Sequence, residues 1–163
     1  MSTLAEVRGG INRLWDSLTE GWRHLVSNAS GALTRFRPAK SKQGSDLPDV
    51  IKSNEWGLLA VDLYDDDENV VVRLEAPGME QDDFDVCIND DVLVVRGEKR
   101  YQNERSEGGY QIAECAYGGF ERVIPLPNTV DGSQAKAKYR QGVLRIEVPK
   151  TGSKRHTIEI QAE

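Results

Sequence analysis

The chain has 163 residues, of which 38% are apolar and 29% are charged. This length suits one domain of ordinary size with extensions, and the modest apolar content argues against a single large enzyme domain. The formal net charge of −6 gives no overall attraction for nucleic acid, so we expect no nucleic-acid partner.

The cysteines and the N-terminal sequence indicate the cellular compartment of the protein. Cys87 and Cys115 are far apart and form no C-x-x-C motif, which favours a reducing compartment or indifference to redox. The N-terminus has no basic-then-apolar signal pattern, and no run approaches the roughly 18 apolar residues of a membrane helix. We therefore expect a cytoplasmic protein.

The first 48 residues predict a variable amphipathic arm followed by a linker. Apolar residues recur there at helical spacing. They are Ile11, Leu14, Trp15, Leu18, Trp22 and Leu25. A lone helix of this length is marginal in water, so the apolar stripe needs a surface to lie against. Prolines, glycine, serines and lysines between 38 and 48 are typical of a linker.

Residues 49–149 predict an all-β domain. Apolar residues alternate in short runs between turn signals such as Pro77-Gly78. The runs lie at 59–63, 70–74, 84–88, 92–95, 120–126, 135–139 and 144–148, with a short additional strand at 110–113. Helical periodicity is absent from this region. We therefore expect an immunoglobulin-like antiparallel β-sandwich of about 100 residues.

The sequence contains no recognisable catalytic motif. Both histidines lie outside the predicted sandwich, and no nucleophile or phosphate-binding motif is present. The acidic run 65–69 resembles the start of a calcium loop, but Val70 stands where that loop needs glycine and Ala76 where it needs glutamate. We expect no catalytic residue, no metal and no cofactor, and thus no enzyme.

The last segment, 150–163, predicts an extended tail with a docking motif. Residues i and i+2 of an extended chain point the same way, so Ile158 and Ile160 would project together and Glu159 would face away. Peptides that dock into grooves or onto sheet edges use alternate side chains in this manner. The polar spacer 150–155 is long enough to reach a neighbouring subunit.

Several short stretches follow one another in a characteristic order. They are Glu75–Met79 (EAPGM), Leu93–Glu98 (LVVRGE), Gly119–Arg122 (GFER), Ala137–Leu144 (AKYRQGVL) and Ile158–Ile160 (IEI). Their order and spacing resemble those of the small heat-shock proteins, which share the α-crystallin-type domain. AKYRQGVL looks like the family's A-x-x-x-x-G-V-L signature, and IEI looks like its I-x-I tail. The long insert at about 99–118 is similar to the bacterial and plant form.

The resemblance implies an ATP-independent holdase chaperone that prevents aggregation of unfolding proteins as a dynamic oligomer of strand-exchanged dimers. A strand at about 110–113 would add to the partner's edge strand at about 58–64. The implied dimer contacts are Arg122, Tyr110 and Ile112. Arg122 would pair with a carboxylate across the dimer, or it is an ordinary surface arginine. The implied groove for the tail isoleucines is lined by Val86, Ile88, Ala137 and Tyr139, four residues that also suit a core.

The arm is the expected client-binding element. Its proposed client contacts are Leu14, Trp15, Leu18, Trp22 and Leu25, which could instead pack between arms inside the resting assembly. The expected partners are further copies of the chain, unfolded clients and ATP-dependent chaperones that receive them. Two alternatives stay open: a monomeric or dimeric β-sandwich adaptor of the co-chaperone kind, and a membrane-surface protein with the arm as an interfacial helix, which Asp16 and Glu20 disfavour.

Overall fold

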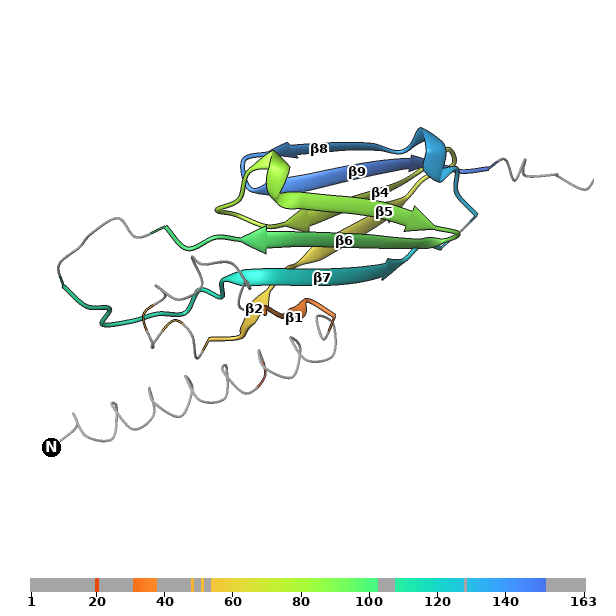
Figure 1. Cartoon of the computed structure of the whole chain (residues 1–163). Coiled ribbons are helices and arrows are strands. Elements are labelled where there is room, and N and C mark those ends of the chain that lie inside the picture. Colours follow the sequence, from red (N-terminus) through yellow and green to blue (C-terminus); the bar gives the residue numbers. More distant parts are fainter. Residues whose placement is uncertain are drawn as a thin grey trace, which may run out of the picture.

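The computed structural model describes residues 31–37, 54–102, 108–127 and 129–151, together with Glu20, Pro48 and Ile51. Within these residues the chain forms nine β-strands and two short 3₁₀ turns (Figure 1). All strand pairings between them are antiparallel. The predicted all-β sandwich is therefore confirmed.

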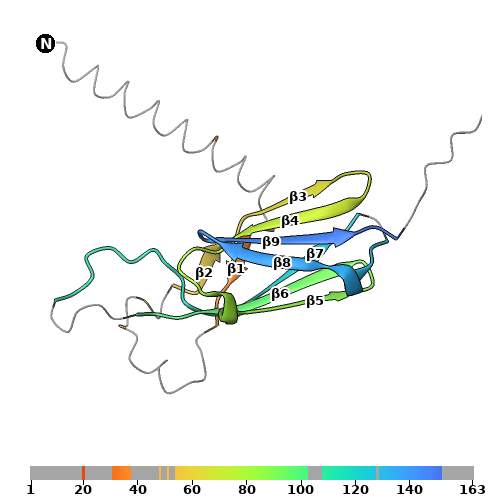
Figure 2. The same cartoon turned by 90° about the horizontal axis from the view of Figure 1, so that it is seen from above.

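Two sheets form the body of the sandwich, and Figure 2 shows them as separate layers. The four-stranded sheet has the order β3 (Val61–Asp65), β4 (Asn69–Glu75), β9 (Val143–Pro149), β8 (Lys136–Arg140). The three-stranded sheet has the order β5 (Phe84–Asn89), β6 (Val92–Lys99), β7 (Gly118–Pro125). β5 and β8 are edge strands on the same side of the molecule (Figure 1).

The core lies between the sheets because apolar residues alternate along the strands. On the two central strands of the larger sheet, the inward positions are fully buried. The largest fully buried side chains are Leu74, Leu93, Ile146, Val70, Val72, Val95 and Val148. Burial of one such side chain contributes about 1.5–3 kcal/mol, so this set dominates the stability of the domain.

Turn chemistry fixes the register of the hairpin between β8 and β9. Gln141 and Gly142 both have positive φ, 51° and 80°, as a two-residue hairpin turn requires. A Cβ atom at Gly142 would lie 3.2 Å from Pro77 Cα, so space as well as φ calls for glycine. The turn sets which residues of β8 face the core.

A third, two-stranded sheet lies beside β7. It pairs β1 (Leu33–Arg35) with β2 (Trp56–Leu58), and Arg37 forms a bridge to Gly119 at the start of β7. Phe36 is buried and its ring centroid is 5.4 Å from that of Phe120. Residues 31–37, which the sequence pattern places in the arm, thus contribute to the core of the sandwich.

The short strand expected at 110–113 is not formed. These residues are irregular, and Tyr110 and Ile112 are 49% and 76% exposed. The described parts of the long β6–β7 connection project from one end of the sandwich (Figure 1). An isolated extended segment has no ladder hydrogen bonds of its own, so a strand at this position needs a partner from elsewhere.

Candidate docking edges

An apolar strip runs between the edges of β5 and β8. Phe84, Val86 and Ile88 of β5 are half-buried and pack against the core from one side, and Ala135 and Tyr139 do so from the other. Ala137, between these two, is exposed. We call these six residues the apolar strip. Its side chains contact the core on one side and solvent on the other, so another apolar group can still cover them.

Each end of the apolar strip is closed. At one end the rings of Phe84 and Tyr139 lie with centroids 5.0 Å apart, and the Tyr139 hydroxyl donates a 2.9 Å hydrogen bond to the Ala76 carbonyl. At the other end, a Cβ atom on Gly132 would lie only 3.2 Å from Ile88 Cβ. The strip therefore suits a short apolar segment rather than a long strand.

The turn η3 (Gly132–Gln134) at the second end is held by its capping residue. The Asp131 carboxylate accepts hydrogen bonds from the Ser133 amide at 3.1 Å and the Ser133 hydroxyl at 2.5 Å. These bonds, the hydroxyl's first, lower the pKa of Asp131, so it is ionised at neutral pH. A capped turn keeps Gly132 against Ile88 and fixes where the strip stops.

All four residues predicted to line a groove belong to the apolar strip: Val86, Ile88, Ala137 and Tyr139. Three of them also pack against the core, as the alternative interpretation expects. The predicted lining includes neither Phe84 nor Ala135, although small Ala135 is expected, with Ala137, to leave room for the isoleucines. Both positions lie two residues from a predicted lining residue, which indicates the same face.

The edge of β3 carries exposed apolar groups. Among the described residues β3 pairs with β4 only, so its other edge has unpaired backbone groups. Leu63 and Tyr64 on this strand are 38% and 67% exposed. Edge strands of this kind invite pairing with another chain unless something covers them. The position agrees with the edge predicted at about 58–64.

The long connection after β6 is organised by aromatic contacts at its base. The hydroxyls of Tyr101 and Tyr110 lie 2.8 Å apart, and this hydrogen bond raises the pKa of Tyr101 to about 12. The ring of Tyr101 also packs edge-on against Tyr117, with centroids 5.4 Å apart, and Lys99 Nζ lies 5.5 Å from the Tyr117 centroid. Tyr110 is held at its hydroxyl, whereas Ile112 points freely into solvent.

Arg122 has an unusual environment on β7. Its side chain is half-buried, and its Nε is buried without a hydrogen-bond partner in the described part of the chain. Burial lowers the pKa of Arg122, and no described carboxylate forms an ion pair with it. A buried donor without a partner is destabilising, so this guanidinium is suited to a partner supplied from outside.

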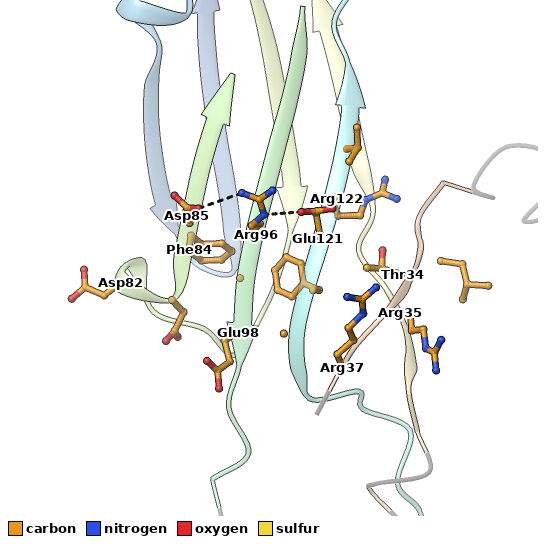
Figure 3. A pocket seen from close by; sticks show the side chains of 16 residues that line it. Thr34, Arg35, Arg37, Asp82, Phe84, Asp85, Arg96, Glu98, Glu121 and Arg122 are labelled. Atoms are coloured by element: carbon orange, nitrogen blue, oxygen red, sulfur yellow. Dashed lines mark hydrogen bonds and ion pairs between the residues drawn. The ribbon is translucent and has the colours of Figure 1, made fainter. Parts of the chain in front are cut away.

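A cleft of about 840 Å³ lies next to Arg122, between β1 and the β5–β6–β7 sheet. Figure 3 shows Arg96 between two carboxylates on the wall of this cleft, while Arg122 points away from them. The Arg96 Nε is 2.6 Å from Glu121 Oε2, and its Nη1 is 3.9 Å from Asp85 Oδ2. The single charge of Arg96 therefore compensates only part of the negative charge of these two carboxylates.

Several predicted residues lie outside the described part of the chain. They are the client-binding residues Leu14, Trp15, Leu18, Trp22 and Leu25 and the tail isoleucines Ile158 and Ile160. Within the described part, no three His, Cys, Asp or Glu side chains are grouped as metal ligands would be. No helix in that part is long and apolar enough to cross a membrane.

The fold and its edges define an antiparallel β-sandwich in which the edge strand β3 pairs with one described strand only, and in which an apolar strip lies between the edges of β5 and β8. The family model described as Hsp20/alpha crystallin family matches residues 62–163. The chain belongs to this family, as the motifs predicted.

Relatives agree with this assignment. The chain is 33% identical over 89 residues to small heat shock protein C4 of Rickettsia felis, a match covering 55% of each chain. It is 30% identical over 124 residues to a probable 15 kDa heat shock protein of Leptospira interrogans, covering 75% of this chain and 94% of that one. The chain thus spans little more than half of the Rickettsia protein.

A solved structure shares the architecture. Heat shock protein 16.0 from Schizosaccharomyces pombe superposes with a TM-score of 0.55 at 26% sequence identity, covering 64% of this chain and 97% of that one. The likeness therefore extends across the α-crystallin-type domain.

Proposed function

We propose that this protein is an ATP-independent holdase chaperone that binds unfolding proteins under stress and prevents their aggregation. The observation that carries the proposal is the apolar strip, which is closed at both ends and half-covered in the single chain. Its size suits a two-isoleucine motif such as Ile158 and Ile160. Membership of the Hsp20/alpha crystallin family and the heat-shock names of the relatives support the proposal.

The assembly is proposed to be a homo-oligomer held by tails. Burial of two isoleucine side chains contributes roughly 3–6 kcal/mol of favourable free energy before any entropic cost is subtracted. Ordering three or four tail residues costs about 1–2 kcal/mol of backbone entropy each. One tail therefore binds weakly, but many tails in one particle bind well through effective concentration. Because the entropic term grows with temperature, warming favours release of the tails.

The repeating unit of the oligomer is proposed to be a strand-exchanged dimer. Residues 110–113 of one chain add to the outer edge of β3 in the other, which gives both segments a neighbouring strand that the described part of a single chain does not supply. Exposed Tyr110 and Ile112 become covered in this arrangement. Arg122 receives a carboxylate of the partner, which satisfies its buried Nε.

Clients are proposed to bind to the arm when the assembly loosens. Unfolding proteins expose apolar surface, and the helical stripe that includes Trp15 and Trp22 offers a matching one. An adaptable apolar segment can re-pack against clients of many shapes. Hand-over of held clients to ATP-dependent chaperones and a cytoplasmic location belong to the same proposal.

The test replaces both Ile158 and Ile160 by serine in the full chain. Native mass spectrometry on a temperature ramp should then show dimers where the unmodified chain forms larger particles. Circular dichroism should show an unchanged β-sandwich. The matched control is Glu159→Gln, because residue 159 of an extended tail points away from its neighbours' side.

Two outcomes would refute the proposal. If the double serine variant keeps its full particle size, the tail does not hold the assembly. If the unmodified chain runs as a monomer and leaves heat-induced light scattering of a model client unchanged, the adaptor alternative is correct instead.

A further inference from the structure

The root of the tail is fastened on two sides. The Lys150 amide donates a 2.9 Å hydrogen bond to the Glu68 carbonyl in the β3–β4 turn. On the other side, the Thr151 amide donates to the Thr129 carbonyl at 3.2 Å, and Val130 forms a bridge to Lys150. Residues 150 and 151 therefore continue beyond β9 in a fixed position, although they belong to neither sheet.

The side chain of Lys150 strengthens the first of these attachments. Its ammonium forms an ion pair with the Asp65 carboxylate, and it donates to the Asp66 carbonyl. The lysine side chain is 19% exposed and that of Asp65 34%, so water screens the pair only in part. A single ammonium thereby joins the tail root to the last residue of the β3 edge.

The turn that receives Lys150 is itself well defined. One oxygen of the Asp66 carboxylate accepts hydrogen bonds from the amides of Asn69 and Glu68, at 2.6 and 2.8 Å. These two bonds lower the pKa of Asp66, and Lys150 adds a smaller effect in the same direction. The anchor of the tail root is thus a rigid Asx turn rather than a loose loop.

The fixed root matters because the remaining spacer is short. Six residues lie between Thr151 and Ile158, so the chain from one to the other spans at most about 25 Å when fully extended and about 15 Å as a flexible chain. The Pro149 carbonyl accepts a 2.7 Å hydrogen bond from Asp131, next to η3, so the tail departs near the closed end of its own apolar strip. With so short a reach, the direction of departure decides which strips are accessible.

We propose that Lys150 is a positioning residue that aims the tail: by fastening residues 150–151 to the β3–β4 turn, it selects which neighbouring chain's apolar strip the tail isoleucines reach. This inference rests on the proposed tail docking and names a residue that decides where each tail docks. Removing the ammonium leaves the strip, the isoleucines and the backbone hydrogen bonds of residues 150–151 intact, but it loosens the root so that the tail departs over a wider range of directions. The assembly then becomes heterogeneous instead of falling apart.

The experiment compares Lys150→Met, Asp65→Asn and the double variant in the full chain, with Lys138→Met as the control. Lys138 is exposed on β8 and forms no ion pair in the described part of the chain. Native mass spectrometry should show a broader distribution of subunit numbers for both single variants. Subunit exchange should be about two- to fivefold faster, as expected for loss of one partly screened ion pair.

Two further measurements separate aiming from general damage. The double variant should differ from the unmodified chain by less than the sum of the two single variants, because both substitutions remove the same ion pair. A synthetic peptide of residues 154–163 should bind with equal affinity to chains that carry Ile158→Ser and Ile160→Ser, with or without Lys150→Met. The midpoint of thermal unfolding should also be unchanged.

The inference is overturned if Lys150→Met has the subunit distribution and exchange rate of the unmodified chain while the double serine tail variant dissociates. It is also overturned if Lys150→Met weakens peptide binding, because the residue then supports the strip and does not aim the tail. If the double serine variant stays fully assembled, the proposed tail docking fails and the aiming role fails with it.

Discussion

The buried Nε of Arg122, which has no hydrogen-bond partner in the described part of the chain, gives the sharpest test of the proposed dimer. Methionine at this position keeps the length and apolar character of the side chain but removes its donors and its charge. In the isolated chain the Nε is buried without a described partner, so Arg122→Met removes an unsatisfied group and the stability of the monomer should not fall. In a dimer with a carboxylate supplied across the interface, the same substitution deletes a charge-assisted hydrogen bond.

The size of the effect follows from the symmetry of the dimer. One hydrogen bond to a charged group contributes about 1.5–3 kcal/mol, and a two-fold interface contains each contact twice. Loss of both therefore amounts to about 3–6 kcal/mol, or a dimer dissociation constant roughly 10²- to 10⁴-fold higher. Because the side chain is only half-buried and solvent screens part of the interaction, the lower part of this range is expected.

The assay is sedimentation equilibrium at several concentrations, in the background of Ile158→Ser and Ile160→Ser, where tail docking no longer contributes. Arg96→Met is the matched control, because Arg96 is exposed and already paired with Glu121 of its own chain. The dimer dissociation constant should change for Arg122→Met only. A variant that dimerises as tightly as its background would show that Arg122 has no partner across the interface, and the reasoning would be wrong.

Three further changes test the arm, the β8–β9 turn and the tail root. Replacing Trp15 and Trp22 by serine should weaken suppression of client aggregation in a light-scattering assay; unchanged protection would move client binding off the arm. Gly142→Ala should lower the free energy of unfolding by about 1–2 kcal/mol because φ is +80° there; urea denaturation with an unchanged slope measures this, and an unchanged midpoint contradicts it. The pKa of Asp66 is lowered from 3.8, so its carboxylate stabilises the turn above that value, and this stabilisation is lost as the pH falls through the folded-state pKa. The amides of residues 68 and 69 should therefore lose protection from exchange in acid, and Asp66→Asn should abolish this pH dependence.

The main strands could be predicted because apolar and polar residues alternate along each of them. The inward residues of β4 and β9 are apolar at every second position, and a turn with two positive φ values joins β8 to β9. β1 could not be predicted in this way. It is three residues long, and the burial of Phe36 depends on Phe120, far away in the sequence.

The strand expected at 110–113 illustrates a different limit. Whether an extended segment forms a strand depends on the edge beside it, and the described residues of the single chain offer none at this position. The position of the apolar strip followed from the family resemblance, and the alternation of apolar and polar residues along β5 and β8 agrees with it. Its closed ends and the attachment of Lys150 could not be predicted, because they depend on how the two sheets are placed relative to each other.

The two ends of the apolar strip limit which polypeptide segments can occupy it. A stretch of unfolded polypeptide would have to run past the Phe84–Tyr139 ring pair or past Gly132 to occupy the strip. A motif of only three residues, such as Ile158–Ile160, fits between these two ends without crossing both of them. If the tail docks as proposed, the strip therefore favours a short motif over a long extended client.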